Sequence, residues 1–140
     1  MVKETKSIRP GLIGEAQITV TETVSAAHLG SGNVHVLSTP SLILLMEKAT
    51  VAAVDPHLPP DQLSVGVSVD VSHLAATPLG MTAKAWAEVV DVDERRVVLQ
   101  VEAYDKVEKI GEGTIQRVIL DRDRFAEYVA RKLPTSDQPD

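Results

Sequence analysis

The chain has 140 residues, and a hydrophobic content of 44% supplies enough apolar side chains for the core of one domain. A net charge of −6 without a basic cluster, and an aromatic content of 3%, argue against nucleic-acid binding through phosphate contacts or base stacking. The sequence contains no cysteine, which excludes disulfide scaffolds, thiolate metal sites and cysteine nucleophiles.

The sequence shows no signal for export or membrane insertion. Residues 1–6 lack the apolar stretch of a signal peptide, and the longest strongly apolar run, Leu42–Met46, is far too short to span a bilayer. We therefore expect a cytoplasmic protein without a membrane partner. We expect residues 1–133 to form one domain and the polar segment 134–140 to be a disordered tail.

The first predicted elements are a strand and a long helix. Apolar and polar residues alternate at 16–21, as in a half-buried strand, and an irregular loop follows. A helix is predicted at 40–54, because Ser38 or Thr39 can cap its first amides and a proline suits its first turn. It should end before Asp55, which precedes another proline. Only two of its fifteen residues are charged, so we expect other elements to wrap it.

Four strands and a final helix are predicted after the long helix. Period-two patterning, interrupted by turn signals, places the strands at 64–74, 82–92, 95–105 and 108–120. The short connections predict an antiparallel meander. Five residues of its first strand are expected to share one face: Val65, Val67, Val69, Val71 and His73. With an amphipathic helix from about Asp121, this order indicates an α+β fold in which a curled antiparallel sheet grips one long helix.

Glu47 is an acid in a helix whose composition otherwise favours burial. Its neighbours three and four positions away are Ile43, Leu44, Thr50 and Val51. A buried carboxylate is costly unless it is paired or protonated, so Glu47 is a candidate functional residue. The alternative is that the helix surfaces at this point and exposes Glu47 to solvent.

His73 and Thr39 are further candidates, and each also has an ordinary structural explanation. His73 is in phase with four valines, and a lone histidine on an apolar face is often a core residue. Thr39 stands where helix capping is expected, about 12 Å along the axis from Glu47, too far for direct contact within one helix. The histidines show no metal-ligand spacing, so we predict neither a metal nor a cofactor.

Four segments carry motifs at compatible spacings. They are Thr39–Glu47 with Leu-Met-Glu, Gly66, Val71–Gly80 with His-Leu-Ala-Ala-Thr-Pro, and Gly111–Arg117 with Gly-Glu-Gly-Thr. Together they resemble the fluoroacetyl-CoA thioesterase family, over roughly residues 34–131. That family has the hotdog fold, which agrees with the sheet and helix order expected above.

The resemblance implies an acyl-CoA thioesterase with Thr39, Glu47 and His73 as its catalytic set. Glu47 would be the nucleophile or the base that activates water, His73 would transfer protons, and Thr39 would orient a group or donate a hydrogen bond. Gly66 and Arg117 would line the substrate site. Gly66 lets its backbone approach the thioester, and Arg117 would hold the substrate or a nearby acid unless it only forms a surface salt bridge.

The loop at 29–36 has no bulky aromatic residue to gate a pocket for a small fluorinated acyl group, and the only Phe is Phe125. We therefore predict a small or medium acyl-CoA as substrate.

Two other functions compete with acyl-CoA hydrolysis. A non-catalytic acyl-CoA-binding hotdog module would not need Glu47, and an enoyl-CoA hydratase would need an Asp near His73, whereas Asp70 falls on the opposite strand face.

The predicted sheet leaves an unpaired strand edge, which a second copy of the chain can cover. We therefore expect a homodimer, which can double to a tetramer, with active sites at the subunit interface. Acyl-CoA is the one other partner that the sequence predicts.

Overall fold

The computed structural model describes residues 7–134, so nearly all of the tail predicted at 134–140 lies outside the described residues. The long elements are β1 (Ile13–Thr19), α2 (Thr39–Val54), β2 (Gln62–His73), β3 (Thr82–Asp93), β4 (Arg96–Tyr104), β5 (Lys109–Asp121) and α3 (Arg122–Ala130). A short helix, α1 (Ala26–Leu29), and two 3-10 turns, η2 (Glu22–Val24) and η3 (Asp55–His57), complete the fold. Within residues 7–134, no helix is long and apolar enough to cross a membrane.

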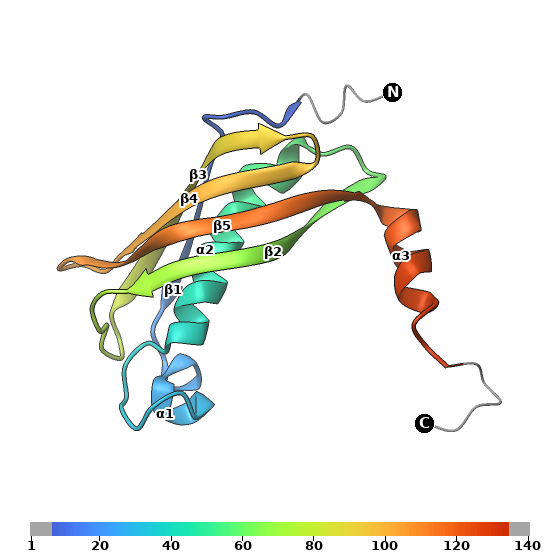
Figure 1. The fold of residues 1–140 in the computed structure, drawn as a ribbon. Coiled ribbons are helices and arrows are strands. Elements are labelled where there is room, and N and C mark those ends of the chain that lie inside the picture. Colours follow the sequence, from blue (N-terminus) through green and yellow to red (C-terminus); the bar gives the residue numbers. More distant parts are fainter. Residues whose placement is uncertain (1–6, 135–140) are drawn as a thin grey trace.

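One curled antiparallel sheet holds α2 against its concave face (Figure 1). The strand order is β1–β3–β4–β5–β2, and α2 packs mainly against β1 and β3. The helix buries a set of apolar side chains there: Leu42, Leu45, Met46, Ala49 and Ala53. They meet small residues of β3 and aliphatic residues of β4 and β5. The predicted α+β class is confirmed.

Small residues allow α2 to lie close to the sheet. A Cβ atom on Gly14 of β1 would lie only 2.3 Å from Ala49 O and Ala53 N, so this position accepts no side chain without separating the strand from the helix. Three alanines of β3 are fully buried under the same helix: Ala83, Ala85 and Ala87. This close packing fixes where the polar residues of α2 stand relative to the sheet.

The predicted bounds hold well for α2 and less well for β1. Ser38 is the N-cap, and the chain leaves the α-helix after Val54, where the Asp-Pro dipeptide forms a 3-10 turn. β1 begins at Ile13 and ends at Thr19, three residues earlier at its start and two earlier at its end than the alternation at 16–21 predicts. Pairing with β3 extends it, because Ile13 lies opposite Glu88.

The prediction of a four-stranded meander is wrong for β2. Only β3, β4 and β5 are consecutive neighbours, and β2 pairs with β5 at the far edge of the sheet. The eight residues at 74–81 that connect β2 to β3 can span up to about 29 Å when extended, so their number does not require the two strands to be neighbours. They pass the start of α2, where Leu37 N donates to Thr77 O and Val36 forms a bridge with Pro78.

A β-bulge in β2 also corrects the predicted phase of that strand. The register against β5 shifts between Gly66 and Ser68. The alternation of inward and outward side chains is therefore offset by one residue between the two sides of the bulge. Val65 is therefore out of phase with Val71 and His73, contrary to the prediction. The bulge turns Gly66 and His73 toward the same side, although an odd number of positions separates them.

The curled sheet wraps α2 as predicted, but in the single chain it covers only one side of the helix. Leu44 is 52% exposed and Val51 is 37% exposed, and Lys48 between them is also exposed. Val67 and Val69 of the edge strand β2 are exposed as well. The described chain thus has an open apolar face that combines one stripe of α2 with β2.

Candidate active site

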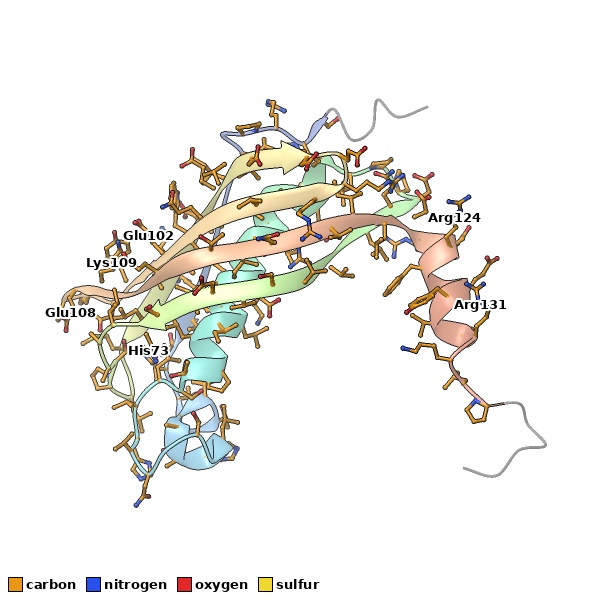
Figure 2. All side chains as sticks on the ribbon, in the orientation of Figure 1. His73, Glu102, Glu108, Lys109, Arg124 and Arg131 are labelled. Carbon is orange, nitrogen blue, oxygen red and sulfur yellow. The ribbon has the colours of Figure 1, made fainter. Side chains whose placement is uncertain are left out.

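Thr39 and His73 meet at the N-terminal end of α2. Ser38 fills the N-cap position, and its Oγ accepts a hydrogen bond from Ser41 N at 3.2 Å. Capping therefore does not account for Thr39, whose hydroxyl lies 2.8 Å from Nδ1 of His73. His73 is the last residue of β2, as Figure 2 shows. The end of one strand and the start of one helix thus supply a hydroxyl–imidazole pair.

The imidazole of His73 is half-buried, and its second nitrogen has no protein partner. Burial lowers the pKa of His73, and a backbone group of Ala75 only partly opposes this effect. No group among residues 7–134 makes a well-formed hydrogen bond to the buried Nε2 atom. An imidazole with one nitrogen beside Thr39 and the other without a hydrogen-bond partner has the chemistry of a proton-transfer group.

Glu47 lies about two helical turns beyond Thr39 and faces the backbone of β2. A Cβ atom on Gly66 would lie 2.7 Å from Glu47 Oε2, so a side chain at this position would displace the carboxylate. Glycine at this position therefore leaves the carboxylate next to bare backbone. Of the two charged residues of α2, Lys48 is exposed, whereas Glu47 is half-buried and directed at the sheet.

Arg117 is a buried cation on β5, directly opposite Gly66 in the strand register. It is only 5% exposed, so the alternative of a surface salt bridge is wrong. Its Nε donates to Ser64 Oγ at 2.8 Å and its Nη2 donates to Ser64 O at 3.0 Å. Its Nη1 donates to Thr50 Oγ1 at 3.3 Å. These bonds fix the guanidinium in one orientation.

Two carboxylates act on the charge of Arg117 from a distance. Burial lowers the pKa of Arg117, and the negative charges of Asp55 and Glu47 oppose that effect. No carboxylate oxygen of the described residues lies within 4.0 Å of the guanidinium. The arginine therefore interacts with both acids electrostatically and makes its direct hydrogen bonds to neutral groups.

The structure brings the five predicted site residues together as two groups. One group is the Thr39–His73 pair, and the other is Glu47 with Gly66 and Arg117. No hydrogen bond or ion pair in residues 7–134 joins the two groups, which stand about 12 Å apart along α2 at 1.5 Å per residue. Within one chain, the site is therefore open between its two halves.

Sequence reasoning missed the polar residues that surround Arg117. Ser64 and Thr50 bind its guanidinium, and Asp55 accepts a hydrogen bond from Ser64 Oγ at 2.6 Å. Ser64 stands two positions before Gly66, so strand alternation places both on one face. The predicted phase of this strand placed its valines on that face and Ser64 on the other.

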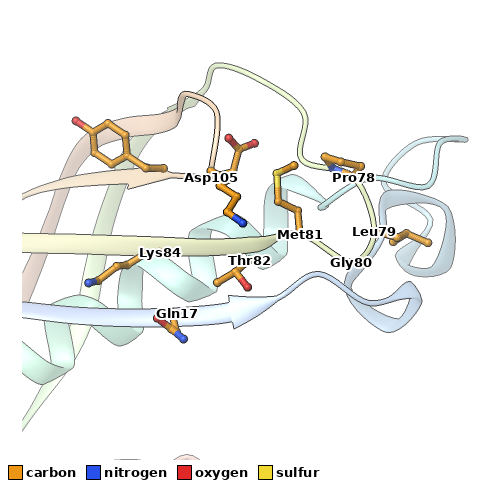
Figure 3. Close-up of a pocket in the computed structure, with 10 residues that line it drawn as sticks. Gln17, Pro78, Leu79, Gly80, Met81, Thr82, Lys84 and Asp105 are labelled. Carbon is orange, nitrogen blue, oxygen red and sulfur yellow. The ribbon is translucent and has the colours of Figure 1, made fainter.

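A separate hollow of about 740 Å³ lies beside the loop between β2 and β3 (Figure 3). It is lined by Gln17, Pro78, Leu79, Gly80, Met81, Thr82, Lys84, Tyr104, Asp105 and Lys106. Lys84 alternates with Ala83 and Ala85, which face the core, so this hollow opens on the outer face of the sheet. None of the five predicted site residues lines it.

No group of three or more His, Asp or Glu residues at 7–134 is arranged to hold a metal ion.

Known proteins resemble this chain in sequence and in fold. A fluoroacetyl-CoA thioesterase of Streptantibioticus cattleyicolor is 39% identical over 99 residues, which are 71% of this chain and 71% of that protein. A solved structure of the fluoroacetyl-CoA thioesterase FlK superposes with a TM-score of 0.82 at 33% identity, covering 91% of this chain and 98% of that one. A hot-dog-like protein from Thermanaerovibrio acidaminovorans shares the fold, with a TM-score of 0.84 at 24% identity, covering 93% and 96%.

The curled sheet around α2 and these relatives define the class of the protein: it is an acyl-CoA thioester hydrolase with the hotdog fold. The model of one family within that class matches residues 18–123. The chain belongs to this family, FlK, which is described as fluoroacetyl-CoA-specific thioesterase.

The environment of His73 predicts how it titrates. In the folded protein its pKa is expected below the ordinary value of 6.5, because burial disfavours the charged form. The unfolded chain then takes up a proton at higher pH than the folded chain does. The unfolding free energy should therefore fall as pH drops from about 6.5 through the folded-state pKa, and level off below it.

NMR titration of the His73 ring protons measures this pKa directly, with His73→Gln to assign the resonance. The same substitution should flatten the fall in the unfolding free energy over that pH range. A folded-state pKa at or above the ordinary value would contradict the account of the His73 environment.

Proposed function

We propose that Thr39, Glu47 and His73 catalyse hydrolysis of the thioester of a small or medium acyl-CoA to the free acid and CoA. Gly66 and Arg117 line the substrate site in this proposal. The observation that carries it is the position of Glu47: the one acid of an otherwise apolar helix faces bare backbone at Gly66, beside a buried arginine.

The side chains supply what thioester hydrolysis needs. Glu47 either attacks the thioester carbonyl carbon or removes a proton from the water that does so. When the tetrahedral intermediate collapses, the C–S bond breaks and the CoA sulfur takes up a proton, which we assign to His73. If Glu47 is the nucleophile, the acyl group remains on it as an anhydride, which a water molecule then hydrolyses to the free acid and the Glu47 carboxylate. Thr39 orients His73 through Nδ1. The bare backbone at Gly66 lets the thioester approach, and the charge of Arg117 stabilises negative charge nearby.

We propose further that a homodimer completes the active site. The open face of the single chain exposes apolar residues of α2 and of β2, and β2 is an edge strand with unpaired backbone groups. A second copy pairing antiparallel along β2 would cover both. It would bury Leu44 and Val51, which flank the half-buried Glu47 on the helix.

The spacing of the two residue groups supports a two-fold axis at the middle of β2. Gly66 and His73 lie on either side of Val69–Asp70, and Glu47 and Thr39 lie on either side of residue 43 of the helix. A two-fold axis through these midpoints places each end of β2 and of α2 in one chain near the opposite end of the same element in the second chain. It brings Glu47 and Gly66 of one chain toward Thr39 and His73 of the other, so that each active site uses both chains.

The residues before Thr39 support a broad acyl preference. The loop at 29–36 carries no Phe, Tyr or Trp, and most of its residues are exposed. FlK is described as specific for fluoroacetyl-CoA. We propose that this chain hydrolyses small and medium acyl groups without that selectivity.

Because CoA thioesters are intracellular metabolites, we assign the enzyme to the cytoplasm.

A panel of acyl-CoA esters, assayed by thiol release, tests this preference. Acetyl, propionyl and longer esters should differ only modestly in kcat/KM, because one methylene in an apolar pocket is worth about 1–3 kcal/mol, or about 10–200-fold. Fluoroacetyl-CoA should fall within the same range. A preference for fluoroacetyl over acetyl of more than about a thousandfold would overturn the account of the 29–36 loop.

Glu47→Gln tests the catalytic assignment. The substitution keeps the shape of the side chain and removes its charge, so the protein should fold as before and lose at least about a hundredfold in turnover. The same change at Glu127, which is exposed on α3, serves as the matched control and should leave turnover unaltered. Near wild-type turnover in folded Glu47→Gln would remove the mechanism and favour an acyl-CoA-binding module.

A further inference from the structure

A chain of hydrogen bonds connects the buried guanidinium of Arg117 to an acid at the end of α2. Asp55 Oδ1 accepts from Ser64 Oγ at 2.6 Å, and Ser64 Oγ accepts from Arg117 Nε at 2.8 Å. On the other side, Thr50 Oγ1 accepts from Arg117 Nη1 and donates to Glu47 O at 2.6 Å. These hydrogen bonds therefore connect the C-terminal end of α2 to the helical turn that carries Glu47.

The direction of each hydrogen bond in this chain is fixed by its two ends. A carboxylate only accepts hydrogen bonds and a guanidinium only donates them. The single hydroxyl proton of Ser64 must therefore go to Asp55, which leaves its lone pairs for Arg117. Removing the Asp55 carboxylate frees the Ser64 hydroxyl to rotate and leaves the buried cation without the acid that this hydroxyl links to it.

Asp55 is the acidic first residue of η3, but the dipole of the long helix α2 does not favour it. It occupies the C-cap position of α2, where the negative end of the helix dipole disfavours an acid. Its backbone is held firmly, since its N–H donates to Val51 O and its carbonyl accepts from Leu58 N at 3.1 Å. A carboxylate on this rigid turn is well placed to hold a second side chain still.

Arg117 keeps part of its donor capacity for the site. Three of its five N–H groups are used, two by Ser64 and one by Thr50. Its Nη1 lies 3.6 Å from the position that a Cβ atom on Gly66 would take, and Glu47 Oε2 lies 2.7 Å from the same point. The guanidinium therefore borders the space next to the proposed reactive carboxylate.

We propose that Asp55, acting through Ser64, is a positioning residue that holds Arg117 in its orientation beside Glu47. This proposal rests on the function proposed above, in which Arg117 lines the substrate site. Asp55 touches neither the substrate nor the reacting atoms. It keeps a buried cation in the geometry in which its remaining N–H donors serve the reaction, where displacements of about 1 Å are costly.

The test is a double-mutant cycle between Asp55→Ala and Arg117→Met, read as kcat and KM. Asp55→Ala should lower kcat by about tenfold and change KM by less than about threefold, because it disturbs geometry at the reacting centre. In the Arg117→Met background it should cost less than about twofold, because the group that it positions is gone. Asp55→Asn keeps an acceptor for Ser64 and should give an intermediate kcat.

Asp61→Ala removes an exposed acid near the start of β2 and is the matched control, with kcat expected to be unaltered. Thermal melts identify a merely structural role, which would lower the melting temperature and reduce kcat equally in both backgrounds. That result, or wild-type kcat in Asp55→Ala, overturns the proposal. If Asp55→Ala does not fold, Ser64→Ala enters the same cycle with the same expectations.

The positioning role of Asp55 and the proposed function are contradicted by different results. A slow Arg117→Met enzyme with an unaffected Asp55→Ala enzyme removes the positioning role and keeps the proposed function. Wild-type turnover in both Arg117→Met and Glu47→Gln removes the proposed site, and the positioning role with it.

Discussion

The close contact between α2 and the concave face of the sheet is the constraint on which the other features depend. Gly14 and the alanines of β3 provide no bulk at this contact, so the helix axis lies as near to the strands as backbone atoms permit. The contact fixes the rotation of the helix about its axis. That rotation aims Glu47 at β2 and leaves Leu44 and Val51 on the open side.

The site combines two kinds of polar residue, and their energetics differ. Thr39 is exposed and His73 is half-buried, and the buried Nε2 atom of His73 has no hydrogen-bond partner among the described residues. Arg117 is a buried charge, which is expensive unless its hydrogen bonds are satisfied. Ser64 and Thr50 satisfy them in part, and the field of two acids compensates the charge. The protein thus maintains a costly cation beside Glu47, which is understandable if the reaction uses it.

Local chemistry made part of this structure predictable from the sequence. The Ser-Thr-Pro start and the Asp-Pro end of α2 gave its bounds, and the single acid on its interior gave Glu47 as a candidate. The strand order was not predictable, because an eight-residue connection is compatible with neighbouring strands and with strands at distant positions. The bulge at 66–68 was equally invisible, since one extra residue leaves the apolar alternation intact while it reverses the faces. The predicted phase placed Ser64 on the outer face of the strand, so its hydrogen bonds with Asp55 and Arg117 were not predictable either.

The central claim is that each active site draws Glu47 from one chain and His73 from the other. Mixing the inactive Glu47→Gln and His73→Ala proteins, with unfolding and refolding to exchange subunits, tests it most directly. A shared site predicts that half of the dimers carry one intact site, so activity should recover to about a quarter of the wild-type value. Sites contained within single chains would give no recovery, and that result would contradict the account.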